Sequence, residues 1–135
     1  EYICNQSSAP MKYDNIPGCT YCHPEVASVG LTEKDAIDKG FKIKVGKFPL
    51  RALGKAVAIG QTDGFVKIIF DEKYGELLGC HIIGANATDL ISEISLARDL
   101  ETTYNEILHS IHPHPTLSEA IMEATADALN EAIHI

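Results

Sequence analysis

The stretch "GFVKIIFDEKYGELLGCHIIG", residues 64–84, decides the fold of this chain. Two apolar runs, 64–71 and 77–84, are rich in β-branched residues and enclose a short polar segment that contains Gly75. Apolar runs joined by a few turn residues are typical of the two strands of a β-hairpin. We therefore predict an antiparallel hairpin in the middle of the chain.

Two further strands are predicted before this hairpin. The segment "EVASVG" (25–30) is short and rich in valine, and "FKIKVGKF" (41–48) alternates apolar and basic residues like a half-buried strand. Between them, "LTEKDAIDKG" (31–40) is typical of a helix, because Thr32 can cap its first turn and Gly40 suits its end.

The second half of the chain is predicted to be helical, with patterns over 86–100, 102–111 and 116–132. Strands followed by helices are typical of an α+β domain, here an antiparallel or mixed β-sheet covered by helices. Residues 1–17 show no sustained period, so we interpret them as a linker or the remnant of a preceding domain. The domain itself is expected to span 18–135.

The last predicted helix has small or narrow side chains on one face. Such a face allows another helix to approach closely. We therefore expect a second helix to pack against it. The residues of this face are Leu117, Ile121, Ala124 and Ala128.

Composition argues against two classes of partner. The 135 residues hold 19 acidic and 11 basic side chains, a formal net charge of −8, which repels nucleic-acid phosphates and anionic lipid. No apolar run approaches the ~20 residues needed to span a bilayer. We expect no nucleic acid and no membrane as partners. A basic stretch over 42–55 is the local exception, either a solvated strand face or a surface for an anionic partner.

The cysteines raise a separate question. Four of them are too few and too irregularly spaced for a disulfide scaffold, so we expect free thiols in a reducing, cytoplasmic compartment. The segment "CTYCH" (19–23) has the spacing of a haem-attachment site, of half a zinc site or of a redox dithiol. A zinc site needs two further ligands, for which His112 and His114 are formally available, and spacing alone leaves these alternatives open.

The segment "HSIHPHPTLSEAIMEA" (109–124) carries the strongest signal for chemistry. Its two prolines hold the preceding histidines in extended conformations, and "TLSE" predicts a capping box with Thr116 as N-cap and Glu119 three residues on. The imidazole of His114 then stands on a stiff turn near a carboxylate, which suits a general base. The alternative is a turn histidine and an ordinary capping glutamate.

Four segments in order resemble one known family. They are "PGCTYCHPEVASVGLTE", "VGKFPLRALGKAVA", "GELLGCHIIGANATDLI" and "IHPHPTLSEAIMEA". Each is similar to a part of the C-terminal interface, or dimerisation, domain of the lipoamide dehydrogenases, which are pyridine nucleotide-disulfide oxidoreductases. The resemblance runs from Asp14 to the end of the chain, about nine-tenths of its length. In this family the segment like "CTYCH" leads into a strand and is neither a redox pair nor a metal site.

The resemblance implies half of an active site. His114 matches the general acid/base that enters the active site of the partner subunit in a homodimer, and Glu119 matches the carboxylate that orients it. The bond between His114 and Pro115 is expected to be cis, with its backbone near the partner subunit's FAD. The substrate would be a dihydrolipoyl dithiol on the carrier protein of a 2-oxo acid dehydrogenase or glycine cleavage complex, with electrons passing through FAD to NAD⁺.

The chain has neither a G-x-G-x-x-G nor a C-x-x-x-x-C motif, so the dinucleotide-binding folds and the redox disulfide are expected upstream in a longer enzyme. We expect the fragment to be inactive alone and to bind no FAD, NAD or metal. The small-residue helix face and the hairpin strands are the expected dimer contacts. Two alternatives remain: an interface domain of a glutathione or mercuric reductase, and a non-catalytic metal-binding or interaction module.

Overall fold

The predicted hairpin lies inside a five-stranded antiparallel sheet in the computed structural model, which describes residues 2–6 and 9–135. Its strands are β4 (Phe65–Asp71) and β5 (Leu77–Gly84). The strand order across the sheet is β1-β2-β5-β4-β3. Both hairpin strands therefore have a paired neighbour on each side, which leaves them no free edge.

The other strands are β1 (Gly18–Thr20), β2 (Glu25–Gly30) and β3 (Ile43–Pro49), and every pairing in the sheet is antiparallel. Helix α1 (Glu33–Asp38) begins directly after its N-cap residue Thr32, whose side chain accepts a hydrogen bond from the backbone N–H of Asp35 in a capping box. Strands β2 and β3 and helix α1 confirm the sequence predictions. The short strand β1 has no signal in the sequence.

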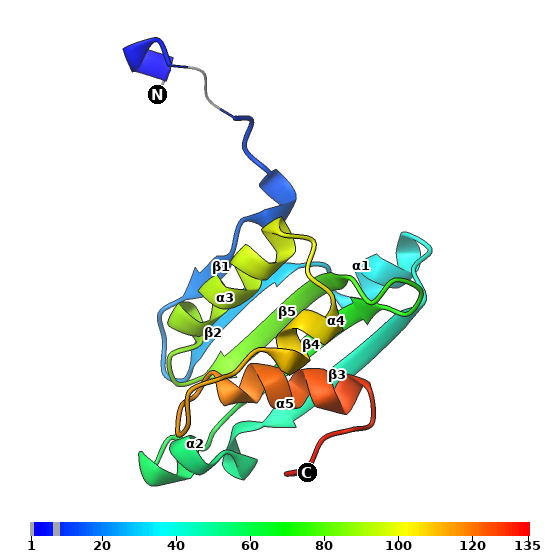
Figure 1. Cartoon of the computed structure of the whole chain (residues 1–135). Helices are drawn as coiled ribbons and strands as arrows, with labels where there is room; N and C mark the ends of the chain where they lie inside the picture. Colours follow the sequence, from blue (N-terminus) through cyan, green and yellow to red (C-terminus); the bar gives the residue numbers. More distant parts are fainter. Residues whose placement is uncertain (1, 7–8) are drawn as a thin grey trace.

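Three helices cover one face of the sheet (Figure 1). They are α3 (Ala87–Asp99), α4 (Tyr104–His109) and α5 (Glu119–Ala128). Sheet first and helices afterwards confirm the α+β class. Among the described residues, no helix is both long enough and apolar enough to cross a membrane. The remaining short elements are α2 (Gly54–Ala58) and 3₁₀ turns at Tyr2–Cys4, Tyr13–Asn15 and Leu50–Ala52.

The main core lies between the sheet and these helices. Ile91 and Ile94 of α3 are buried in it as the helical pattern predicted, and each fully buried side chain of this size contributes about 2 kcal/mol of hydrophobic free energy. A smaller cluster on the other face joins Ala36 of α1 to Ile69 and Leu78 of the hairpin. The largest fully buried side chains of the main core include Phe48, Phe70, Leu50, Ile68 and Ile82.

Strand β3 is half-buried, as its alternating pattern predicted, but it carries apolar side chains on both faces. Phe48 is inaccessible on the helix-covered face, while Ile43 and Val45 pack against the smaller cluster on the opposite face. Lys44 extends from the same face as Phe48 and places its ammonium 5.9 Å from the ring centroid of Tyr104. Lys44 is half-buried, so a basic residue at this position does not by itself mark a solvent-exposed face.

Helix α5 lies directly on β3 at Gly46. A β-carbon on Gly46 would be 1.8 Å from the carbonyl oxygen of Ala124 and 2.6 Å from the amide nitrogen of Ala128. The small-residue face of α5 therefore packs on a strand of its own sheet. The expectation that this face receives another helix or a second copy of the chain is wrong, because Ile121, Ala124 and Ala128 are buried within the protomer.

The segment before β1 is fixed to α3. Nδ2 of Asn15 donates a hydrogen bond of 2.8 Å to the carbonyl oxygen of Ser95. Nη1 of Arg98 donates to the carbonyl oxygen of Asp14 at 2.8 Å and to Oδ1 of Asn15 at 2.6 Å. These contacts lie within the stretch interpreted as a linker, and the boundary between residues 17 and 18 stays a prediction.

We expect Gly46→Ala to destabilise the chain by about 3 kcal/mol, because the new methyl group meets backbone atoms that cannot rotate away. Urea denaturation followed by circular dichroism measures the loss. Gly54→Ala is the matched control, since a β-carbon there has nothing within 4 Å. Equal stability of the two variants would contradict the close approach of α5 to β3.

Candidate active site

The candidate site lies on the turn that joins α4 to α5, residues 110–118. Pro113 and Pro115 restrict the backbone on both sides of His114, and all three residues are exposed. The peptide bond between His114 and Pro115 is cis, as the resemblance implied. The imidazole is thus presented to solvent by a turn with little conformational freedom.

The structure brings His114 and Glu119 together. Nδ1 of His114 lies 2.9 Å from Oε1 of Glu119, the first residue of α5. The side chain of His114 is 79% exposed, whereas that of Glu119 is 17% exposed. A carboxylate on Nδ1 fixes the tautomer with the proton on that nitrogen. No partner for Nε2 is found in the described part of the chain, so this nitrogen can exchange a proton with another molecule.

Glu119 is itself held in place. Its Oε2 accepts a hydrogen bond of 2.8 Å from the backbone N–H of Thr116, so the two carboxylate oxygens have different partners. Burial favours the neutral acid, but the Thr116 amide and the ring of His114 outweigh it and lower the pKa of Glu119 below its ordinary value. The carboxylate is therefore ionised at neutral pH and able to stabilise a protonated imidazole.

Only half of the predicted capping box is present. Glu119 reaches back to the amide of Thr116, but the hydroxyl of Thr116 donates to the carbonyl oxygen of Pro113 at 2.7 Å and does not cap the helix. Helix α5 begins at Glu119, after a turn that includes Ser118. The prediction of Thr116 as N-cap is wrong, because the proline-rich turn takes up its hydroxyl.

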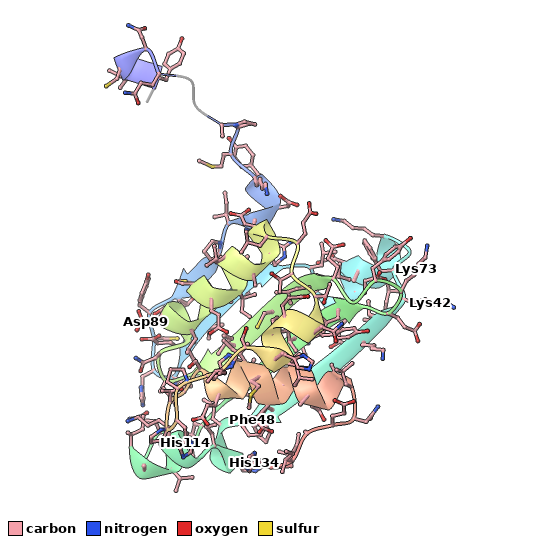
Figure 2. All side chains as sticks on the ribbon, in the orientation of Figure 1. Lys42, Phe48, Lys73, Asp89, His114 and His134 are labelled. Atoms are coloured by element: carbon pink, nitrogen blue, oxygen red, sulfur yellow. The ribbon has the colours of Figure 1, made fainter. Side chains whose placement is uncertain are left out.

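A second histidine–glutamate pair lies beside the first. Nδ1 of His134 is 2.6 Å from Oε1 of Glu123, whose side chain is buried and whose Oε2 has no hydrogen-bond partner in the described part of the chain. Figure 2 shows His134 and His114 at the same end of the molecule. Nothing in the local sequence signals this pair, since its members are 11 residues apart. Both pairs line a cavity of about 300 Å³ with Phe48, Leu53 and Met122.

The "CTYCH" segment does not form a metal centre with the distant histidines. Cys19 belongs to β1 and packs against the core, while Sγ of Cys22 lies 3.0 Å from the carbonyl oxygen of Pro24. Across residues 2–6 and 9–135, no three His, Cys, Asp or Glu side chains are grouped so that they could share a metal ion. All four cysteines are free, and burial raises the pKa of the Cys80 thiol.

The described part of the chain is thus an antiparallel sheet domain that presents an exposed histidine backed by a carboxylate. Residues 16–125 match the family described as the pyridine nucleotide-disulphide oxidoreductase dimerisation domain. The match covers more than half of the chain. The chain belongs to this family.

Curated relatives agree with this assignment. The chain is 54% identical over 125 residues to a dihydrolipoyl dehydrogenase of Zymomonas mobilis, covering 93% of this chain and 27% of that enzyme. It is 48% identical over 134 residues to the dihydrolipoyl dehydrogenase of Bacillus subtilis, covering 99% of this chain and 28% of that enzyme. The chain thus spans just over a quarter of the length of the relatives it matches.

Solved structures share the fold. LpdA from Mycobacterium tuberculosis superimposes with a TM-score of 0.83 at 25% sequence identity, over 92% of this chain and 27% of that protein. The agreement covers most of this chain. It confirms the dimerisation-domain type of α+β fold predicted from the sequence.

We expect Glu119→Gln to lower the free energy of unfolding by roughly 1 kcal/mol at pH 7, because two hydrogen bonds lose their charged acceptor. The folded-state pKa of Glu119 is lowered, so its contribution is present above about pH 4.5 and is lost as the pH falls through the lowered pKa. The difference between wild type and variant should therefore close in acid.

Urea denaturation at pH 7, 5 and 3.5 measures this difference. Glu131→Gln is the matched control, because Glu131 is exposed and no side-chain hydrogen bond is found for it in the described structure. A constant difference across the three pH values would contradict the ionised contact between Glu119 and His114.

Proposed function

We propose that this chain is the interface domain of a dihydrolipoyl dehydrogenase that works as a homodimer. His114 would be the general acid/base in the active site of the partner subunit, and Glu119 would be the residue that orients it. The observation that carries this proposal is the exposed ring of His114 with its Nδ1 2.9 Å from the Glu119 carboxylate. Membership of the dimerisation-domain family and the named relatives support it.

The geometry supports one direction of proton transfer. A thiol has an ordinary pKa near 8.5, so only a few per cent is the reactive thiolate at neutral pH. Nε2 of His114 would take the thiol proton. Nδ1 would keep its own proton and donate it in a hydrogen bond to the carboxylate of Glu119. The positive charge formed on the ring is then stabilised by the adjacent carboxylate. In the reverse reaction, the same nitrogen returns the proton to sulfur.

The residues of this domain do not fit a dinucleotide-binding site. Among the described residues the sheet is antiparallel throughout, whereas such sites use a parallel β-α-β unit with a glycine-rich turn. We place FAD and NAD in other domains of the full-length enzyme. This chain would contribute the backbone of His114 and Pro115 near the partner subunit's FAD.

An exposed apolar side chain in the turn supports pairing with another surface. Ile111 is 97% exposed and lies three residues before His114. Large apolar side chains are characteristic of the buried centre of dimer interfaces. We propose that the turn enters the partner subunit and that a lipoyl-carrier protein of a 2-oxo acid dehydrogenase or glycine cleavage complex delivers the substrate.

Four free cysteines support a cytoplasmic location.

We expect His114→Gln in the full-length enzyme to lower kcat with dihydrolipoamide by about 10²- to 10⁴-fold, the usual contribution of a positioned general base. Turnover with small-molecule electron acceptors should fall much less, because it does not require deprotonation of a thiol by His114. His109→Gln, at an exposed histidine at the end of α4, is the control. A mild effect with dihydrolipoamide would remove His114 from this role. Turnover of glutathione disulfide or of mercuric ion would indicate a sister reductase.

Contribution across the dimer is tested by complementation. Full-length His114→Gln enzyme and a variant without its redox-active cysteines should each be inactive. After dissociation and reassociation together, half of the dimers carry one intact site of two, so about a quarter of wild-type activity should return. No recovery, with heterodimers demonstrated by a tag on one variant, would show that each site uses its own His114.

A further inference from the structure

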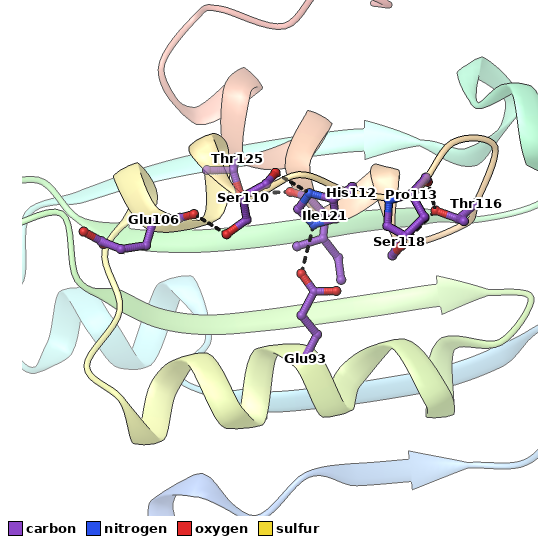
Figure 3. A network of polar contacts seen from close by, with 9 residues as sticks. All are labelled: Glu93, Glu106, Ser110, His112, Pro113, Thr116, Ser118, Ile121 and Thr125. Atoms are coloured by element: carbon purple, nitrogen blue, oxygen red, sulfur yellow. Dashed lines mark hydrogen bonds and ion pairs between the residues drawn. The ribbon is translucent and has the colours of Figure 1, made fainter.

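A second buried contact holds the turn of His114 against α3. Nε2 of His112 lies 3.0 Å from Oε1 of Glu93 in the middle of that helix, and Nδ1 lies 3.1 Å from the carbonyl oxygen of Ser110 (Figure 3). The side chain of His112 is 6% exposed, in contrast to the open ring two residues later. The two histidines of "HPHP" therefore have opposite environments.

The contacts of His112 favour a charged ring. Both of its ring nitrogens face acceptors, and a neutral imidazole has only one N–H to donate. The hydrogen bond to Glu93 raises the pKa of His112 against the opposing effect of burial, and the more distant Glu119 acts in the same direction. The pair is thus a charge-assisted link between the turn and α3.

The turn is fixed on both sides of His114. Before it, His112 is bonded to α3, and the hydroxyl of Ser110 donates to the carbonyl oxygen of Glu106 at 2.7 Å. After it, the amide of Thr116 donates to Glu119, the residue that also holds the ring. Glu119 therefore sets the orientation of the imidazole, while His112 sets the position of the backbone that carries it.

We infer that His112 and Glu93 are a positioning pair, which holds the turn so that His114 is presented at a fixed distance from the sheet domain. An effect of this pair on catalysis rests on the function proposed above. Its role in holding the turn in place does not depend on that function. A displacement of about 1 Å at a reacting group can reduce the rate by up to 10²-fold. The pair links α3 to the turn through side chains 19 residues apart in the sequence.

The first test uses the 135-residue chain and nuclear magnetic resonance. In the wild type, both ring nitrogens of His112 should be protonated at pH 6, and backbone order parameters for 111–118 should be near 0.85. Glu93→Gln should shift loss of the His112 proton to lower pH, and Glu93→Ala should reduce the order parameters of the turn below about 0.6. His109→Gln, the control, should change neither.

The stability of the same chain gives an independent readout. Because the folded-state pKa of His112 is raised, its contribution is present below the ordinary value of 6.5 and is lost as the pH rises through the raised pKa. The wild type should lose stability over that interval, and His112→Gln should lose less. Glu93→Gln, a nearly isosteric change at a partly exposed residue, serves if His112→Gln does not fold.

The second test uses the full-length enzyme. Glu93→Ala should lower kcat with dihydrolipoamide about tenfold or more, with KM changed less than about twofold and small-acceptor turnover retained. Glu93→Gln, which keeps one neutral hydrogen bond, should have a smaller effect. A turn that stays ordered with unchanged His114 ring shifts in both Glu93 variants would overturn the inference. Full dihydrolipoamide turnover by His114→Gln would instead overturn the proposed function, while the measurements on the chain still decide the positioning role.

Discussion

Direct contact between α5 and β3 is the constraint on which the site depends. Gly46 has no side chain, so the backbone of α5 at Ala124 and Ala128 comes to rest on the strand itself. This contact fixes the height of the helix above the sheet, and Glu119 is the first residue of that helix. The carboxylate that holds His114 is therefore positioned by the packing of the core.

Much of the fold was predictable because its signals are local. The hairpin at 64–84 has a strong apolar pattern, and the helices have periodic apolar faces and capping residues such as Thr32 and Thr103. The position of α5 was not predictable, because small residues allow close approach without specifying whether a helix or a strand is approached. The environment of Lys44 was not predictable for a related reason. A long basic side chain on a strand can lie over an aromatic ring instead of pointing into solvent.

The candidate site shows the same division between local and distant contacts. The pairing of His114 with Glu119 spans five residues of one turn, so proline restriction and the start of a helix were enough to suggest it. The links from Glu93 to His112 and from Glu123 to His134 join separate elements, and their geometry exists only after the helices pack. A single sequence contains residue types at those positions but no information about which of them meet.

Helix α3 binds two parts of the chain that are far apart in the sequence. Its residues Ser95 and Arg98 bind the segment around Asn15, and Glu93, on the same helix, binds His112. These three attachment points fall within about 8 Å along the helix axis, at about 1.5 Å per residue. One helix therefore holds both the segment that leads into β1 and the turn that carries the two histidines of "HPHP".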